Sequence, residues 1–357
     1  MIRLSWRQFR TQAAVACAVL AVIAVILAIT GPHLVHLYDT TVAPCKTYGD
    51  CGLAQSVFVR SDGKLQSFLA DFLLVVPALI GIFWGAPLIA RELEAGTFRL
   101  AWTQSITRKR WLAAKLGVVG LASIAVAALL SLMVTWWSNP FDRVNADRFS
   151  PAMFGERGIT PVGYAAFAFV LGVTAGVLIR RTLPAMAGTL AAFVGARVAM
   201  TIWVRPHLIA PVRTSLSFLS LGSKTGVGIG NTPSGLSMIV PETAIAPNAW
   251  IYTNQIIDTA GHAPTNRFLR AACPLAAGGP PPGSQTGGGS AGPHSSPSGA
   301  AAFHACIAKV AAQFRVVVTY QPAGRYWAFQ ACETAIFLAL ALILAGVCLW
   351  WIRHRLS

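Results

Sequence analysis

Six long blocks of apolar residues constrain this chain more than any other feature of its sequence. They run over residues 13–30, 68–90, 116–137, 161–179, 182–204 and 329–352. Each is close to the ~20 residues that an α-helix needs to cross a bilayer core of roughly 30 Å. Of the 357 residues, 55% are hydrophobic and only 11% are charged, whereas soluble domains carry about 25% charged residues. We therefore predict an all-α integral membrane protein with six transmembrane helices.

The basic residues predict the orientation of these helices. If the spans alternate, four clusters of Arg and Lys fall on one side of the membrane. The clusters are Arg3, Arg7 and Arg10; Arg91, Arg99, Arg108, Lys109, Arg110 and Lys115; Arg180 and Arg181; and Arg353 and Arg355. Segment 138–160 instead balances three Arg against three acidic residues. The positive-inside rule therefore predicts cytoplasmic termini in a multi-pass cell-membrane protein, with the net charge of +16 reporting orientation and not nucleic-acid binding.

Residues 1–12 are expected to form an amphipathic cytoplasmic helix. Ile2, Trp6 and Phe9 share one helical face, and three Arg share another, which suits a helix lying among lipid headgroups. The same Arg residues also fit a simple positive-inside signal, and the two interpretations are compatible. No small-x-small cleavage site follows the first block, and residues 31–33 (Gly-Pro-His) are expected to end that helix. The first block is therefore predicted to be a retained anchor.

Two long segments, 33–67 and 205–328, are expected outside the cell. The second includes 274–300, which consists almost entirely of Gly, Pro, Ser and Ala and is predicted to be a disordered insert. Its flanks, 212–269 and 303–320, can fold, and 316–320 (Val-Val-Val-Thr-Tyr) has the composition of a strand. The sequence thus predicts an extracellular domain over 205–328, before the last span and cytoplasmic tail at 329–357.

Four cysteines lie in the predicted outer segments, where disulfides persist. Cys45–Cys51 and Cys273–Cys306 are the favoured pairs among three possible connectivities, and the second would close the flexible insert into a loop. A metal site is the alternative, but no two of these cysteines have C-x-x-C spacing.

Segment 91–115, between the second and third spans, has the features of a docking surface. Acidic Glu92 and Glu94 lie near its start and Arg108 near its end, the order that complements a helix macrodipole. Gly96 falls inside an otherwise helical run that offers large apolar side chains for burial. We expect a short helix that docks onto another protein; a solvated connector without a partner is the alternative.

The segment resembles the coupling helix of ABC-2 type transporter permeases, the transmembrane subunits of bacterial ABC exporters. The resemblance comes from an acidic residue, Gly-Thr and a basic residue ahead of the third span. It falls on Arg91, Glu92, Glu94, Gly96, Thr97, Arg99 and Arg108. The stretch from 320 to 333 is similar to actinobacterial members. Six spans, cytoplasmic termini and a large loop before the last span also match, although the outer insert is longer than in compact members.

This resemblance implies a permease that exports a hydrophobic or amphipathic compound, such as a drug, an antibiotic or a lipid. Its partners would be an ABC ATPase subunit, a second permease copy or sister permease, and membrane lipid, with no nucleic acid. The sequence has no G-x-x-x-x-G-K-[ST] phosphate-binding loop, so the ATP and Mg would be held by the partner ATPase. We expect no catalytic site, no metal and no cofactor in this chain. The alternatives are a membrane-anchored sensor or assembly protein with a ligand-binding outer domain, and a membrane enzyme acting on lipid-linked substrates.

Three ionisable residues fall within the predicted spans: Asp71, Arg197 and Glu333. A charge near the bilayer centre costs at least ~2.5–3.5 kcal/mol on insertion scales, so such groups usually pair or face a cavity. The outer thirds of spans five and six can meet because these helices are antiparallel. We predict an interior Arg197–Glu333 salt bridge that locks an outer gate, with Asp71 as a rival partner of Arg197 and separate snorkelling to the headgroups as the alternative.

Overall fold

The computed structural model describes residues 2–45, 51–96, 108–144, 148–218, 228–232, 235–240, 248–274 and 297–354. The chain forms two compact units. Unit 1 comprises Met1–Asn145, Ser150–Ile209 and Tyr326–Ser357, and unit 2 comprises Ala146–Phe149 and Ala210–Arg325. Unit 1 is helical, and unit 2 combines helices with two small sheets.

Among the described residues, six helical segments are long and apolar enough to cross a membrane, and all belong to unit 1 apart from the first three residues of the last. These spans are Phe9–Val42, Ala54–Glu94, Arg110–Trp137, Thr160–Ile179, Thr182–His207 and Ala323–His354. The helices that build them are α1 (Ile2–Leu37), α3 (Gly52–Leu79), α4 (Ala86–Glu94), α6 (Arg108–Trp137), α9 (Thr160–Ile179), α10 (Thr182–Ala199), α11 (Arg205–His207) and α17 (Tyr326–His354). The prediction of six helical spans is confirmed.

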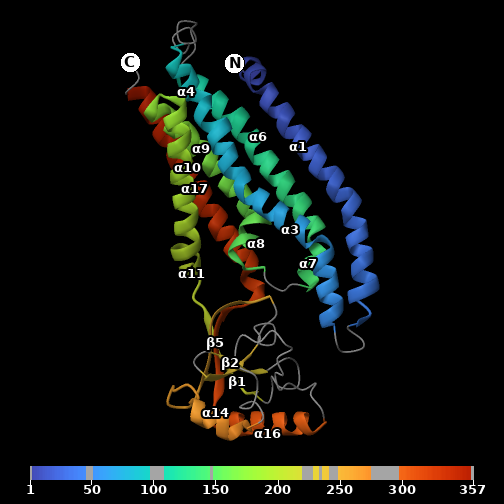
Figure 1. The fold of residues 1–357 in the computed structure, drawn as a ribbon. Coiled ribbons are helices and arrows are strands. Elements are labelled where there is room, and N and C mark those ends of the chain that lie inside the picture. The colour runs from blue at the N-terminus through green and yellow to red at the C-terminus, as the bar shows by residue number, and fades with distance from the viewer. Residues whose placement is uncertain are drawn as a thin grey trace. The chain divides into compact units, whose positions relative to one another are not determined.

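Three of the spans contain a π-helical segment, in which the chain takes a wider turn than in an α-helix. These segments are η1 (Tyr38–Val42), η2 (Ile80–Gly85) and η3 (Met200–Val204). Short helices α7 (Asn139–Val144) and α8 (Pro151–Glu156) connect the third span to the fourth. The start of α1 and the ends of α4 and α17 lie at one end of the bundle, here called the terminus end (Figure 1). Helices α7, α8 and α11 lie at the opposite end (Figure 1). It is called the disulfide end here, after the Cys45–Cys51 bond between the first two spans.

The first span is longer than the sequence suggested. Residues 1–12 were expected to form a separate helix, but Ile2–Leu37 is one helix that includes Pro32. The expected stop at Gly31-Pro32 is therefore wrong. The helix is held there by α6, because Trp137 Nε1 donates to Thr30 Oγ1 at 2.9 Å and Gly31 leaves room for the ring of Trp136. Helix α1 therefore continues through Pro32, although proline cannot donate the usual backbone hydrogen bond there.

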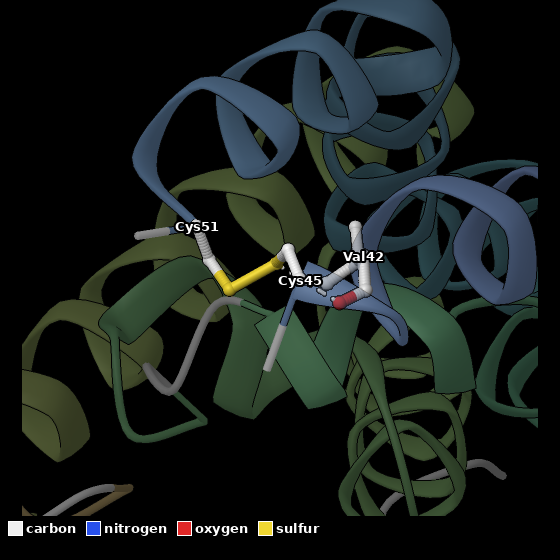
Figure 2. Close-up of a disulfide and its surroundings, with 3 residues drawn as sticks. All are labelled: Val42, Cys45 and Cys51. Atoms are coloured by element: carbon white, nitrogen blue, oxygen red, sulfur yellow. Dashed lines mark hydrogen bonds between the residues drawn. A yellow bond between two sulfur atoms is a disulfide. The ribbon is translucent and has the colours of Figure 1, made fainter. Parts of the chain in front are cut away.

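Most of the predicted outer segment 33–67 is also helical. The first span continues through η1 to Val42, and α3 begins at Gly52. The connection left between the first two spans is closed by a disulfide between Cys45 and Cys51, with Cα atoms 5.4 Å apart. Figure 2 shows this disulfide beside Val42, whose carbonyl oxygen lies 3.0 Å from Cys45 Sγ. The sulfur bridge thus joins the ends of the two helical spans directly.

Helix α9 is the centre of unit 1 and packs against α17, α6, α10 and the η2–α4 segment. Glycines on the contacting faces allow the backbones to approach closely, as is common between membrane helices. A Cβ added to Gly81 would lie 2.7 Å from the Ala168 carbonyl oxygen, and one added to Gly176 would lie 2.7 Å from the Ala86 carbonyl oxygen. Gly172 faces the Gly81 carbonyl oxygen in the same way. No larger residue fits at these positions without moving a helix.

Unit 2 contains a three-stranded antiparallel sheet and a hairpin. The sheet has the order β1 (Val212–Leu216), β5 (Arg315–Gln321), β4 (Trp250–Ile257), and the hairpin pairs β2 (Gly228–Thr232) with β3 (Gly235–Ile239). Strand β5 covers the strand expected at 316–320, whereas the sequence did not predict its partners. Helices α14 (Asn266–Ala272) and α16 (Pro297–Gln313) complete the unit.

The core of unit 2 is apolar and contains a second disulfide. Phe218, Val310, Val316 and Val318 are fully buried, and Cys273 is bonded to Cys306 across α14 and α16. This pair and Cys45–Cys51 are the two pairs favoured from the sequence. The last four residues of the insert predicted over 274–300 belong to α16, which begins at Pro297. Residues 275–296 lie outside the described residues.

We predict that Gly172→Ala destabilises the bundle, because its new methyl group would overlap the Gly81 backbone. Overpacking of this kind typically costs about 1–3 kcal/mol. The matched control is Gly195→Ala on α10, where an added Cβ meets no atom within 4 Å. Thermal unfolding of the purified protein in detergent should show a lower midpoint for Gly172→Ala only. Equal midpoints for the two variants would contradict the close packing.

Candidate functional site

At the terminus end, an ion pair joins the second span to the third. Lys115 Nζ on α6 bonds to Glu92 Oε1 on α4. The lysine side chain is 3% exposed and the glutamate side chain 19%. A buried ammonium group needs this partner, because an unpaired charge away from water is costly. Glu92 is therefore already engaged within the chain.

A second carboxylate joins the second span to the fifth. Glu94, the last residue of α4, accepts hydrogen bonds from the Thr182 backbone N–H at 3.1 Å and from its hydroxyl at 2.7 Å. Thr182 is the first residue of α10, so Glu94 satisfies an amide that has no partner inside that helix and lies at the positive end of its dipole. The ends of α4 and α10 are thus fastened together by a side chain that the sequence alone assigned to an external partner.

The segment predicted to couple to an ATPase begins at this junction. Arg91 is exposed, and α4 ends at Glu94 instead of continuing through Gly96. Gly96 has φ +69°, a left-handed conformation that ends helices and favours glycine. The expectation of a helix running through Gly96 is therefore wrong. Thr97 and Arg99 lie outside the described residues, and Arg108 begins α6.

At the disulfide end, a buried carboxylate bonds to groups from two other helices. Glu333 on α17 is fully buried and receives two bonds from Arg205, Nε to Oε2 at 2.9 Å and Nη2 to Oε1 at 3.0 Å. The Tyr164 hydroxyl on α9 also donates to Glu333 Oε1. Arg205 is 1% exposed, and its guanidinium lies 4.2 Å from the Phe154 ring centroid. Charge pairing, two parallel bonds and ring stacking are the contacts that a buried guanidinium needs.

The predicted Arg197–Glu333 salt bridge is wrong in its cation. Glu333 does lie in the bundle interior, but its partner is Arg205, eight residues after Arg197. Arg197 lies instead over the Tyr164 ring, 3.9 Å from its centroid. Arg205 lies one residue beyond the end that the sequence predicts for the fifth span, Val204, whereas η3 and α11 extend this span to His207. Asp71 is exposed on α3, and in the described part of the chain it forms no ion pair with Arg197.

Gln330, which the sequence analysis did not select, joins the same helices one turn away from Glu333. Its Oε1 accepts from the backbone N–H groups of Ile159 and Thr160 at 3.0 and 3.1 Å, at the start of α9. Its Nε2 donates to the Phe154 carbonyl oxygen at 2.9 Å. A fully buried amide with both ends bonded fixes α17 against the α8–α9 turn.

Glu156, the last residue of α8, is a buried carboxyl group whose hydrogen bonding is incomplete. It is 1% exposed, and its Oε1 has no hydrogen-bond partner among the described residues. Burial raises the pKa of its carboxyl to about 7; Arg157 and Arg197 oppose the rise, and Asp71 adds to it. Arg157 is itself paired with Asp142 on α7. The pKa of the Glu156 carboxyl therefore lies near neutral pH.

The polar side chains described above connect helices at the two ends of the bundle. Among the residues that the structure describes, no cluster of three or more His, Cys, Asp or Glu could hold a metal ion. The polar side chains inside the bundle are used to join α4 to α6 and α10, and α17 to α9 and α11.

A family model described as ABC-2 membrane transporter related matches residues 17–205, which is more than half of the chain. No curated protein and no solved structure matches the chain. The matched region covers most of the first span, the second to fourth spans, nearly all of the fifth, and both carboxylates at the end of α4.

We predict strong coupling between Arg205 and Glu333. Glu333→Leu alone leaves a buried guanidinium unpaired, which typically costs about 3–5 kcal/mol, whereas replacing both partners by apolar residues is often close to neutral. Thermal stability should therefore fall much more in Glu333→Leu and in Arg205→Met than in the double variant. Arg197→Met with Glu333→Leu is the control pair and should show no such recovery. Additive losses for Arg205 and Glu333 would contradict the pair.

We also predict a pH-dependent effect at Glu156. Its pKa of about 7 exceeds the ordinary value of 4.5, so the folded state binds the proton more tightly, and stability falls as the pH rises from about 4.5 to about 7. Glu156→Gln should stabilise the protein at pH 8 by up to about 3 kcal/mol and have little effect at pH 4.5. Thermal unfolding at a series of pH values tests this. A stabilisation that does not change with pH would contradict it.

Proposed function

The chain belongs to the ABC-2 membrane transporter related family, and from this we propose that it is the membrane-spanning permease subunit of an ATP-driven exporter. A separate ABC ATPase subunit binds ATP and Mg and hydrolyses the ATP. The cargo is a hydrophobic or amphipathic compound. Two permease copies, or this chain and a sister permease, form the path between them.

The observation that carries the proposal is the pair of side-chain contacts at the α4 end. The segment after α4 is the part assigned to bind the ATPase, and Glu94 joins its start to Thr182 of α10. Glu92 joins it to Lys115 of α6. A force applied by the ATPase to this segment would therefore reach the third and fifth spans through two short, charged contacts. In this mechanism Glu92 and Glu94 connect helices within the chain. The residues between Gly96 and Arg108 contact the ATPase.

The distribution of charge supports the proposed orientation. Four arginines belong to helix ends at the terminus end of the bundle: Arg91 near the end of α4, Arg353 near the end of α17, and Arg180 and Arg181 before α10, whose start bonds to Glu94. The disulfide end carries acidic and basic groups together, including the Arg157–Asp142 pair. The positive-inside rule then puts the terminus end in the cytoplasm and both disulfides outside, where disulfides persist. Unit 2 is accordingly proposed as an extracellular domain.

The alternative function is a membrane-anchored sensor or assembly protein whose unit 2 binds a ligand. Unit 2 has its own apolar core and disulfide, so it can fold as a domain. A sensor of this kind would need no ATPase subunit, which distinguishes the two proposals experimentally.

We predict that the tagged chain co-purifies with an ABC ATPase subunit and that Arg99→Glu weakens this association. Reversing one interface charge should lower the affinity at least about tenfold, which corresponds to ~1.4 kcal/mol. The control is Arg213→Glu, a charge reversal at an exposed position of β1 in unit 2. Association and ATPase stimulation should be lost together in Arg99→Glu and kept in Arg213→Glu. Equal association of both variants would contradict docking through this segment.

A further inference from the structure

A groove runs between α1 on one side and α3, η2 and α4 on the other, and α6 forms its floor. Its volume is about 590 Å³. Most of its lining is apolar, including Val15 and Val19 of α1, Phe72 and Val76 of α3, and Leu130 of α6. A smaller recess of about 290 Å³ adjoins it at the terminus end and shares Gln12, Trp84 and Arg91 with it. The two form one cleft with a long apolar body and a polar mouth.

The η2 segment explains why the groove is open. On its inner side, Gly81 and Gly85 hold it against the α9 backbone. On its outer side, Ile80, Phe83 and Trp84 line the groove. At the mouth, α1 is fixed to η2 by Gln12 Nε2, which donates to the Phe83 carbonyl oxygen at 3.4 Å, and by Phe9, whose ring meets Trp84 edge to face at 4.9 Å. Such π-helical turns are frequent at functional sites.

The mouth of the groove has a positive charge available. Arg91 is exposed, and no described carboxylate forms an ion pair with it. Glu92 also lines the recess, but Lys115 neutralises it. The exposed guanidinium thus lies at the polar end of an apolar groove, near the end of α4. Guanidinium groups bind phosphate with parallel hydrogen bonds.

We propose that this groove binds an anionic phospholipid from the leaflet on the terminus side of the membrane. One acyl chain lies along Val19 and Val76, and the phosphate meets Arg91. The assignment of this ligand class rests on the proposed function, since the groove has to face the bilayer. The volume is in the range of small-molecule pockets, ~300–1,000 Å³. A membrane-spanning helix of a second chain, about 10 Å wide and ~30 Å long, has several times the volume of this groove. Its apolar surface would also leave the Arg91 guanidinium without a partner.

The test uses the full-length protein in vesicles of phosphatidylcholine that contain a small fraction of a photoactivatable lipid. The reactive group is on the acyl chain, and the headgroup is either phosphatidylglycerol or phosphatidylcholine. Peptide mass spectrometry locates the adducts. We expect adducts on residues 15–20 and 72–83, formed about fivefold more with phosphatidylglycerol, the effect of one basic side chain at a membrane surface. Arg91→Gln should abolish this preference, and Arg353→Gln, at an exposed position of the same bundle end, should keep it.

A second variant tests the apolar body. Val19→Trp fills the groove and should lower labelling by both lipids about tenfold. Val194→Trp is the matched control, because Val194 is 48% exposed on α10 and Val19 is 40% exposed. If Val19→Trp does not fold, Arg91→Gln still decides the question, since it changes an exposed residue.

Three results would overturn the proposal: equal labelling by the two lipids, adducts spread evenly over the exposed faces of α10 and α17, or crosslinks from residues 15–20 to a second copy of the chain. The last result would make the groove an interface between copies. Labelling requires no ATPase subunit. The lipid site can therefore fail while the permease assignment holds, and loss of ATPase binding in Arg99→Glu leaves the labelling unchanged.

Discussion

The close backbone contact between α9 and the η2–α4 segment determines much of the rest of unit 1. Gly81 and Gly85 on one helix and Gly172 and Gly176 on the other leave no room for side chains between them. In a bilayer, association of helices depends on such packing and on hydrogen bonds between helices, since lipid tails are as apolar as the helices themselves. The contact sets the position of α4, and α4 in turn places Glu92 and Glu94 beside Lys115 and Thr182.

Buried charges and amides are the second constraint, and they lie at the two ends of the bundle. At the disulfide end, Glu333 and Gln330 of α17 bond to Arg205, Tyr164 and the start of α9. At the terminus end, the α4 carboxylates bond to α6 and α10. The fifth span, α10 to α11, therefore carries a polar contact at each of its ends. This span therefore connects the terminus end to the Arg205–Glu333 pair through α10, η3 and α11.

Much of the helical architecture could be predicted from the sequence, since apolar length and the positions of Arg and Lys depend on the bilayer alone. The partners of the buried polar side chains could not be predicted. Arg205 was passed over because a charge just beyond an apolar block looks like a flanking residue, and the π turn that brings it inward has no simple sequence signature. Gly31-Pro32 predicts a helix end, but the helix continues there beside Trp136 and Trp137, which pack on Thr30 and Gly31 from more than a hundred residues away. The acidic residues Glu92 and Glu94 resemble a docking surface because their partners within the chain, Lys115 and Thr182, lie on other helices, 23 and 88 residues away.

The central claim is that the segment between α4 and α6 transmits work from an ATPase to the bundle. Photo-crosslinking in intact cells tests it most directly, with a photoreactive amino acid replacing Trp102 in that segment and, as a control, Arg213 in unit 2. The account predicts that position 102 forms an adduct with an ABC ATPase subunit and that position 213 does not. Adducts from position 102 with lipid or unrelated proteins alone, in cells that express the ATPase, would contradict it.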